Sequence, residues 1–408
     1  MKPADGRGNA KSLRLLTYLM FMMFAMTTDS AGVIIPEVVR AYHLSLTEGG
    51  AFHYASMTGI ALAGLGLGFL ADRIGRKATI ITGLVVFGVA AGLFVAGDGF
   101  LFFVCLLFIA GAAIGVFKTG ALALVGDLTS SGADHTRTMN LIEGFFGVGA
   151  IIGPAVVTQL LLHGVSWRWL YAGAGCLAMV LAAIALSARY PARREKAAAP
   201  ARFSASLRMM SDAHVLGFSA AAMLYVGVEA GVYVWLPSLL AGYRGSLATL
   251  VLYALPLFFA LRAVGRFVGS FLLARLSWPV VLAVSTGAVL VCFIASQAGQ
   301  AAAAIALPVS GLFMSVIYPT INSKGISCFP KREQGAVSGV ILFFTCLGAV
   351  LAPLAMGWAG DHFGGPAAGF ALAAGLAAML FLAALGNAVA NPSRARLERV
   401  EAEAANEV

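Results

Sequence analysis

Six ionisable side chains interrupt long apolar stretches of this sequence, and their chemistry is the first feature that needs an explanation. They are Asp29, Lys118, Glu143, Glu229, Arg262 and Arg266. An ionised side chain in the hydrocarbon of a bilayer costs about 2.5–3.5 kcal/mol on insertion scales. If these stretches cross a membrane, each of the six residues therefore needs a partner or a function.

The composition indicates that they do cross a membrane. Of 408 residues, 60% are hydrophobic and only 11% are charged, which leaves a soluble domain too little polar surface to face water. A spanning helix needs about 20 mainly apolar residues. The apolar windows predict twelve such helices, over 13–36, 46–71, 78–96, 101–126, 138–162, 169–186, 214–240, 248–273, 279–297, 299–323, 335–358 and 367–389.

The basic residues decide the predicted orientation. The net charge is +9, but nearly all of the Lys and Arg fall in alternate loops, which is the pattern of cytoplasmic loops and not of nucleic-acid binding. We predict a cytoplasmic tail over 1–12, a six-helix bundle over 13–188, a cytoplasmic linker over 189–212 and a second bundle over 213–390. The charged tail over 391–408 is expected to be cytoplasmic and disordered.

A glycine-rich apolar segment runs directly into a charged turn after the second predicted span. Its pattern is Gly68-x-Leu70-x-Asp72-Arg73-x-Gly75-Arg76-Lys77. A positively charged turn would explain the basic residues but not the ordered Gly, Asp and Gly. The pattern resembles the signature of major facilitator superfamily transporters. The resemblance implies an all-α membrane fold of two pseudo-symmetric six-helix bundles, with Asp72, Arg73 and Arg76 at a cytoplasmic gate.

Two carboxylates lie on polar helical stripes. Glu143 shares a face with Asn140, and Glu229 lies between Tyr225 and Tyr233, each one helical turn away. A carboxylate flanked by aromatic rings suits the hydroxyls and ring faces of a sugar, and would also suit a cation. The alternative is that both carboxylates only neutralise Arg or Lys across the bundle.

Short motifs in five spans, in the same chain order, are similar to the fucose–galactose–glucose:proton symporter family of bacterial sugar permeases. They are Val116-Phe-Lys118-Thr, Asn140-Leu-Ile-Glu143-Gly, Leu224-Tyr-Val-Gly-Val-Glu229, Trp235-Leu-Pro-Ser, Gly265-Arg266-Phe and Gly311-Leu-Phe-x4-Tyr-Pro319. The resemblance implies that Asn140, Glu143 and Glu229 contact the solute. Tyr318 and Asn322 form a polar stripe that could complete the site.

The sequence departs from that family at both positions linked to protons. The family usually carries Glu before Thr on the fourth span, where this chain has Lys118. On the first span, Gly32 takes the place of the family's carboxylate and Asp29 lies one turn earlier. We predict that Asp29 and Lys118 form an ion-coupling switch. The alternative is a static ion pair that locks two helices.

These observations predict a secondary active transporter and not an enzyme. The expected solute is a sugar or sugar derivative, moved with protons across the bacterial inner membrane by alternating access. The alternative is a transporter of an organic anion or other charged solute, including an efflux antiporter, because Lys118 and Arg262 would attract a carboxylate. The sequence has neither a nucleotide-binding loop nor metal-ligand spacing. We therefore expect no cofactor, no metal and no nucleic acid, and a monomer in contact with lipid.

Overall fold

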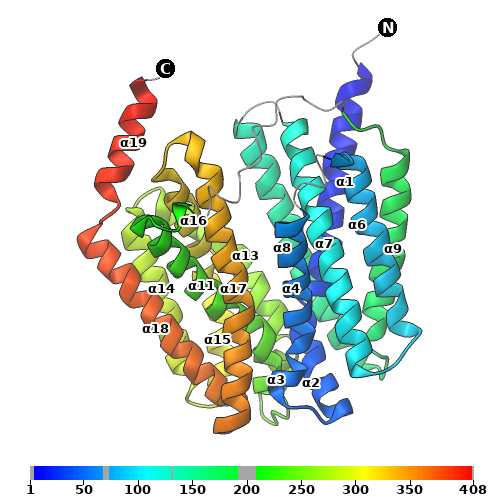
Figure 1. Ribbon diagram of the computed structural model, residues 1–408. Helices are drawn as coiled ribbons and strands as arrows, with labels where there is room; N and C mark the ends of the chain where they lie inside the picture. The colour runs from blue at the N-terminus through cyan, green and yellow to red at the C-terminus, as the bar shows by residue number, and fades with distance from the viewer. Residues whose placement is uncertain (1–3, 68–72, 130–131, 192–207, 407–408) are drawn as a thin grey trace. The chain divides into compact units, whose positions relative to one another are not determined.

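The computed structural model describes residues 4–67, 73–129, 132–191 and 208–406. These residues form helices joined by turns, and no strand occurs among them (Figure 1). The chain divides into two compact units, unit 1 over 1–198 and unit 2 over 199–408. The predicted bundles over 13–188 and 213–390 each fall within one unit.

Unit 1 contains the helices of the first six predicted spans. They are α1 (Ala4–Thr28), α2 (Ala31–Tyr42), α3 (Leu46–Gly49), α4 (Ala51–Gly66), α6 (Arg76–Gly92), the short 3₁₀ helix η1 (Leu93–Val95), α7 (Phe100–Leu128), α8 (Gly132–Leu162) and α9 (Arg168–Ser187). The turn before α6 depends on Gly75, whose φ of +88° is one that side-chain-bearing residues rarely adopt.

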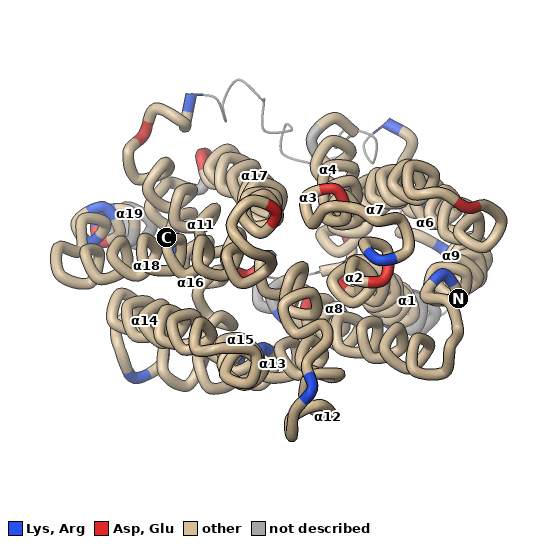
Figure 2. The backbone as a smooth tube through the Cα atoms, turned by 90° about the horizontal axis from the view of Figure 1, so that it is seen from below, with Lys and Arg blue, Asp and Glu red and all other residues tan. Residues whose placement is uncertain are grey.

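Unit 2 contains the helices of the last six spans and one further helix. They are α11 (Ala213–Leu240), α12 (Ala248–Leu252), α13 (Ala254–Leu273), α14 (Trp278–Ser296), α15 (Gln300–Met314), α16 (Ile317–Ser327), α17 (Lys331–Phe363), α18 (Pro366–Ala390) and α19 (Arg394–Asn406). Charged positions are sparse along the helices of both units (Figure 2), as lipid-embedded helices require.

Eleven helical segments of the described chain are long and apolar enough to cross a membrane. Two of these segments each contain two consecutive helices separated by a break: α1 with α2, and α15 with α16. The second predicted span corresponds to α3 and α4, and its predicted end at Ala71 lies outside the described residues. The all-helical membrane fold is thus the predicted one.

The same order of helix packing occurs in both units. In unit 1, α1 packs on α8, α4 on α7, and α6 on both α7 and α9. In unit 2, α11 packs on α17, α13 on α15, and α14 on both α15 and α18. If the spans of each unit are numbered one to six, the first span packs on the fifth and the second on the fourth. The third span packs on both the fourth and the sixth. This repeat is the internal pseudo-symmetry expected of a transporter built from two bundles.

Glycines spaced one turn apart bring the helices of these pairs together. A Cβ atom at Gly149 or Gly153 of α8 would collide with the backbone of α1 at Met22 or Met26. A Cβ atom at Gly111 of α7 would collide with the backbone of α4 at Ser56. Without a hydrophobic driving force between helices in lipid, such close backbone contact is a main source of helix association.

The first span is broken, although the sequence pattern predicted one helix over 13–36. Between α1 and α2 lie Asp29 and Ser30. Hydroxyl groups before and at the break donate to backbone carbonyls three or four residues earlier, including Thr28 to Phe24 O (3.1 Å) and Ser30 to Met26 O (2.6 Å). Such bonds compete with the helical ladder and bend helices.

The tenth span is also broken, at Ser315 and Val316 between α15 and α16. Pro319 lies in the first turn of α16 and has no N–H to donate to the carbonyl of Ser315. The helical ladder therefore cannot pass this point unchanged. The eighth predicted span, 248–273, is likewise divided, at Tyr253 between α12 and α13.

One prediction about the chain termini requires correction, that of disorder after residue 390. The predicted cytoplasmic tail over 1–12 is helical from Ala4 onward, because α1 continues past its apolar window. The predicted disordered tail over 391–408 contains helix α19, red in Figure 1. Ser393 and Leu397 are buried at 3% and 8% exposure, so this segment packs on unit 2 despite its high charge.

Candidate functional site

A buried ion pair lies within the spanning helices of unit 2. The Arg262 Nη2 atom of α13 lies 2.5 Å from Oε1 of Glu229 on α11. The Glu229 side chain is 8% exposed and that of Arg262 is 26% exposed. Glu229 is thus engaged by a cation, as the alternative interpretation of the sequence expected.

Aromatic rings lie beside this ion pair. Tyr225, one turn before Glu229, stacks on Tyr318 of α16 with ring centroids 6.3 Å apart. The Tyr225 hydroxyl donates to the carbonyl of Met314 at 2.8 Å, at the end of α15 where the span is broken. Tyr233 stacks on Phe259 of α13 at 6.2 Å. Three of the predicted site residues, Tyr225, Glu229 and Tyr318, thus belong to one cluster.

The remaining predicted residue of unit 2 lies one turn further along α16. Asn322 is half-buried, as is Tyr318. Arg266, predicted to anchor the eighth span, follows Gly265, where a Cβ atom would collide with the carbonyl of Leu312. The Gly-Arg-Phe motif therefore marks the close approach of α13 to α15, a packing role that glycine alone allows.

The predicted residues of unit 1 lie on α7 and α8. Asn140 and Glu143 are exposed on α8. The Lys118 ammonium of α7 lies 5.6 Å from the ring centroid of Phe146, which is one turn after Glu143. The structure therefore brings Lys118 to the part of α8 that carries Glu143.

Asp29 lies at the break of the first span and is 7% exposed. Among the ion pairs of the described residues, none joins Asp29 to Lys118. The structure thus does not show the two predicted ion-coupling residues in contact, and their coupling stays a prediction.

The predicted cytoplasmic gate is described only in part. Asp72 lies outside the described residues. Arg76, in the first turn of α6, donates from Nε to Oδ2 of Asp127 on α7 at 3.0 Å, and both side chains are largely buried. Arg73 is described just before this helix. The basic turn is therefore tied to the end of the fourth span by a carboxylate that the motif did not indicate.

Comparison with known proteins decides the family. Residues 17–353 match the Major Facilitator Superfamily. The chain belongs to this superfamily. It is 26% identical over 386 residues to the L-fucose-proton symporter of Escherichia coli, covering 85% of this chain and 86% of that protein. It is 23% identical over 374 residues to protein TsgA of Shigella boydii, covering 90% and 93% respectively.

Solved structures of transporters show the same fold. A variant of the Escherichia coli fucose:proton symporter aligns with a TM-score of 0.64 at 24% identity, covering 91% of this chain and 97% of that one. The nucleoside transporter NupG aligns with a TM-score of 0.74 at 13% identity, covering 93% and 98%. Membership of the superfamily makes this protein a transporter and not an enzyme. Within its described residues, no group of His, Cys, Asp and Glu could hold a metal ion.

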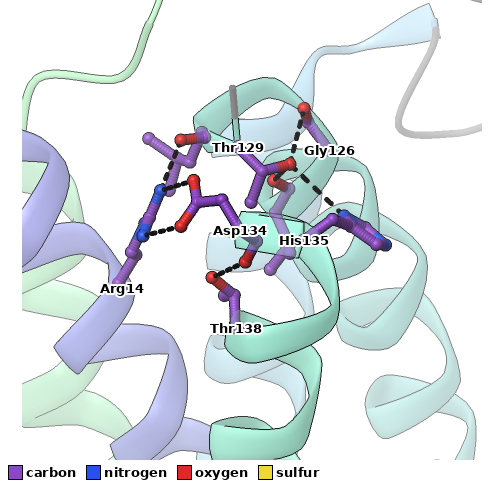
Figure 3. Close-up of polar contacts among 8 residues, drawn as sticks. Arg14, Gly126, Thr129, Asp134, His135 and Thr138 are labelled. Carbon is purple, nitrogen blue, oxygen red and sulfur yellow. Dashed lines mark hydrogen bonds and ion pairs between the residues drawn. The ribbon is translucent and has the colours of Figure 1, made fainter. Parts of the chain in front are cut away.

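One arginine at the end of unit 1 of this transporter was not predicted to have a role. Arg14 of α1 donates to both carboxylate oxygens of Asp134, at 2.8 and 2.6 Å, and to the carbonyl of Leu128 at 2.7 Å (Figure 3). Asp134 lies in the first turn of α8, and Leu128 ends α7. Arg14, within α1, therefore joins the end of α7 to the start of α8, and we call this group the Arg14 clasp.

A second arginine joins helix ends in unit 2, and we call this group the Arg396 clasp. Arg396 of α19 donates to Asp212 Oδ2 at 2.8 Å and to the carbonyl of Cys328 at 3.0 Å. Its guanidinium also covers the ring of Phe329 at 4.0 Å. Asp212 is the N-cap of α11 and accepts from the amide of His214. No short motif signals either clasp, because each partner is more than 60 residues away.

Proposed function

We propose that this protein is a secondary active transporter of a small polar solute of the sugar class, and that transport is coupled to protons. One observation carries the proposal: the buried Glu229–Arg262 ion pair lies beside stacked aromatic rings within spanning helices. Ionisable groups at such depth are costly and mark solute or ion pathways. The name of the L-fucose-proton symporter supports both parts of the proposal.

In unit 2 we assign solute binding to Glu229, Tyr225 and Tyr318, with Tyr233 and Asn322 as further polar contacts. Carboxylate oxygens accept hydrogen bonds from sugar hydroxyls, and they do so strongly because they are charged. Aromatic rings offer flat apolar faces to the C–H surface of a sugar ring. Arg262 then holds the carboxylate in place and supplies donors of its own.

In unit 1 we assign Asn140 and Glu143 to the solute, and the coupled proton to Asp29. Asp29 lies at the break between α1 and α2. A broken helix can change conformation more easily than a continuous one, so the Asp29 carboxylate can move during transport. Intramembrane carboxylates of this kind commonly serve as proton carriers. Lys118 remains the proposed partner of Asp29 in ion coupling, and Asp72, Arg73 and Arg76 the proposed gate.

Binding is tested first, with purified protein and a panel of sugars in a thermal-shift assay, since a ligand of the folded state raises its apparent stability. Tyr318→Ala should weaken binding of the best ligand about 3- to 10-fold, whereas Tyr318→Phe retains the ring and most of the affinity. Failure of every sugar and sugar derivative to stabilise the protein would overturn the proposed solute class.

Coupling is tested by uptake into proteoliposomes with and without a pH gradient. Asp29→Asn should abolish gradient-driven accumulation while exchange of labelled solute continues. Lys118→Gln should also lose accumulation if Lys118 is the partner of Asp29. Full gradient-driven uptake by both variants would rule out this coupling mechanism.

A further inference from the structure

Arg262 and Lys118, two cations within the spans of this transporter, differ in the groups that balance their charge. In unit 2, Arg262 has a carboxylate at 2.5 Å. In unit 1, no carboxylate of the described residues forms an ion pair with Lys118, whose neighbour is the Phe146 ring at 5.6 Å. A cation–π contact offsets only part of the cost of placing a charge within a membrane span. Lys118 therefore retains the capacity to bind an anion.

The stretch of α8 that Lys118 meets carries glycines and polar side chains. A Cβ atom at Gly144 or Gly147, the glycines on either side of Phe145 and Phe146, would meet no atom within 4 Å. Asn140 and Glu143, about two turns and one turn before Gly147 respectively, are exposed and carry an amide and a carboxylate. A positive charge on α7 thus lies beside the Phe146 ring, on the stretch of α8 that also carries Asn140 and Glu143.

We propose that Lys118 binds a carboxylate group of the solute, so that the preferred solute is a sugar acid and not a neutral sugar. This inference rests on the proposed function and names its substrate class. The ammonium group of lysine is a compact point charge that pairs well with one carboxylate.

Two matched pairs of solutes test the proposal: galactose with galacturonate, and glucose with glucuronate. Members of each pair differ only by a carboxylate in place of a hydroxymethyl group. Titration calorimetry on the purified full chain should show the acid binding about 10- to 100-fold more tightly, as expected for one charge-assisted contact. Lys118→Gln should abolish this preference, and Lys118→Arg should retain most of it.

A control variant separates this role from a general loss of positive charge. Arg275 also lies over an aromatic ring, Phe271 at 4.1 Å, but it is exposed in unit 2. Arg275→Gln should leave both affinities unchanged. Lys118→Glu, which reverses the charge, should shift the preference to the neutral sugar of each pair.

The possible failures of the proposal are distinct. If the neutral sugars bind as tightly as the acids, or if Lys118→Gln retains the acid preference, the role of Lys118 is wrong and the sugar transporter stands. Binding of sugar phosphates but not of uronates would also overturn the carboxylate assignment. If no sugar and no sugar acid binds, the proposed function itself fails.

Discussion

The Arg14 clasp and the Arg396 clasp satisfy the same chemical need with residues from different parts of the chain. In each, one guanidinium donates to a carbonyl at the end of the fourth or tenth span and to an Asp at the start of another helix. Terminal carbonyls of a helix have no partner within it, and an acid is favoured at a helix start. In each unit, one arginine thus links the end of the bundle's fourth span to the start of another helix.

The two clasps differ in the helix to which the arginine belongs. Arg14 belongs to α1, a spanning helix packed on α8 within unit 1. Arg396 belongs to α19, which follows the last span and is held to unit 2 by a few buried residues. Opening the Arg14 clasp therefore disturbs a span, whereas the Arg396 clasp can open when one short helix moves away. The comparison predicts global effects in unit 1 and local effects in unit 2.

Arg14→Ala should have the largest effect. It removes a two-point hydrogen-bonded ion pair with Asp134, whose side chain is 25% exposed, and leaves the Leu128 carbonyl without this donor. We expect a loss of about 2–3 kcal/mol in the free energy of unfolding. Arg14→Lys should recover only part of it, because lysine cannot make the paired bonds. Thermal unfolding in detergent measures both, and equal stability of Arg14→Ala and the unaltered protein would contradict the clasp.

Arg396→Ala should have a smaller and more local effect. Asp212 keeps its bonds to the amides of α11, so we expect a loss of about 1–2 kcal/mol. Hydrogen exchange should rise selectively over α19, and a protein truncated after Ser393 should have the same stability as Arg396→Ala. Faster exchange throughout unit 2 would show that the two clasps do not differ in the proposed way.

Asp212→Asn removes the negative charge of the Arg396 clasp but keeps a good N-cap for α11. We therefore expect it to lower the free energy of unfolding by only about 1 kcal/mol. Burial alone would raise the pKa of Asp212, but hydrogen bonds from Arg396 and from the amides of His214 and Val215 outweigh it and lower the pKa below its usual 3.8. The stabilisation is thus complete above this value and is lost as the pH falls through the lower folded-state pKa. Asp212→Asn should flatten the acid end of the stability curve, and an unchanged curve would argue against the pair.

Two exposed ion pairs should show the smallest effects and serve as controls. Arg40 pairs with Glu37, and Arg394 pairs with Glu398 within α19. Because both pairs are largely solvent-exposed, Arg40→Ala and Arg394→Ala should each leave the unfolding free energy nearly unchanged. Arg394→Ala is the matched control for Arg396→Ala, since it removes an arginine of the same helix without opening the clasp. A loss as large as that of Arg396→Ala would assign the effect to α19 itself.

The sequence alone determined the fold class of this protein. Long apolar windows have no other stable arrangement in lipid than helices, since every backbone polar group must be satisfied internally. The signature around Gly75 and Arg76 pointed to the superfamily that comparison then showed. Sequence also singled out Glu229, Tyr225 and Tyr318, because polar groups in apolar spans are costly enough to stand out.

Only the tertiary structure decided which partners these residues have. Arg262 meets Glu229 across two helices, Lys118 meets Phe146, and the two clasps join segments more than 60 residues apart. The charge-rich composition of the C-terminal segment predicted disorder, yet burial of Ser393 and Leu397 and the bonds of Arg396 hold α19 in place. Composition describes a segment by itself, whereas packing depends on the surface it meets, and that surface exists only after the helices have assembled.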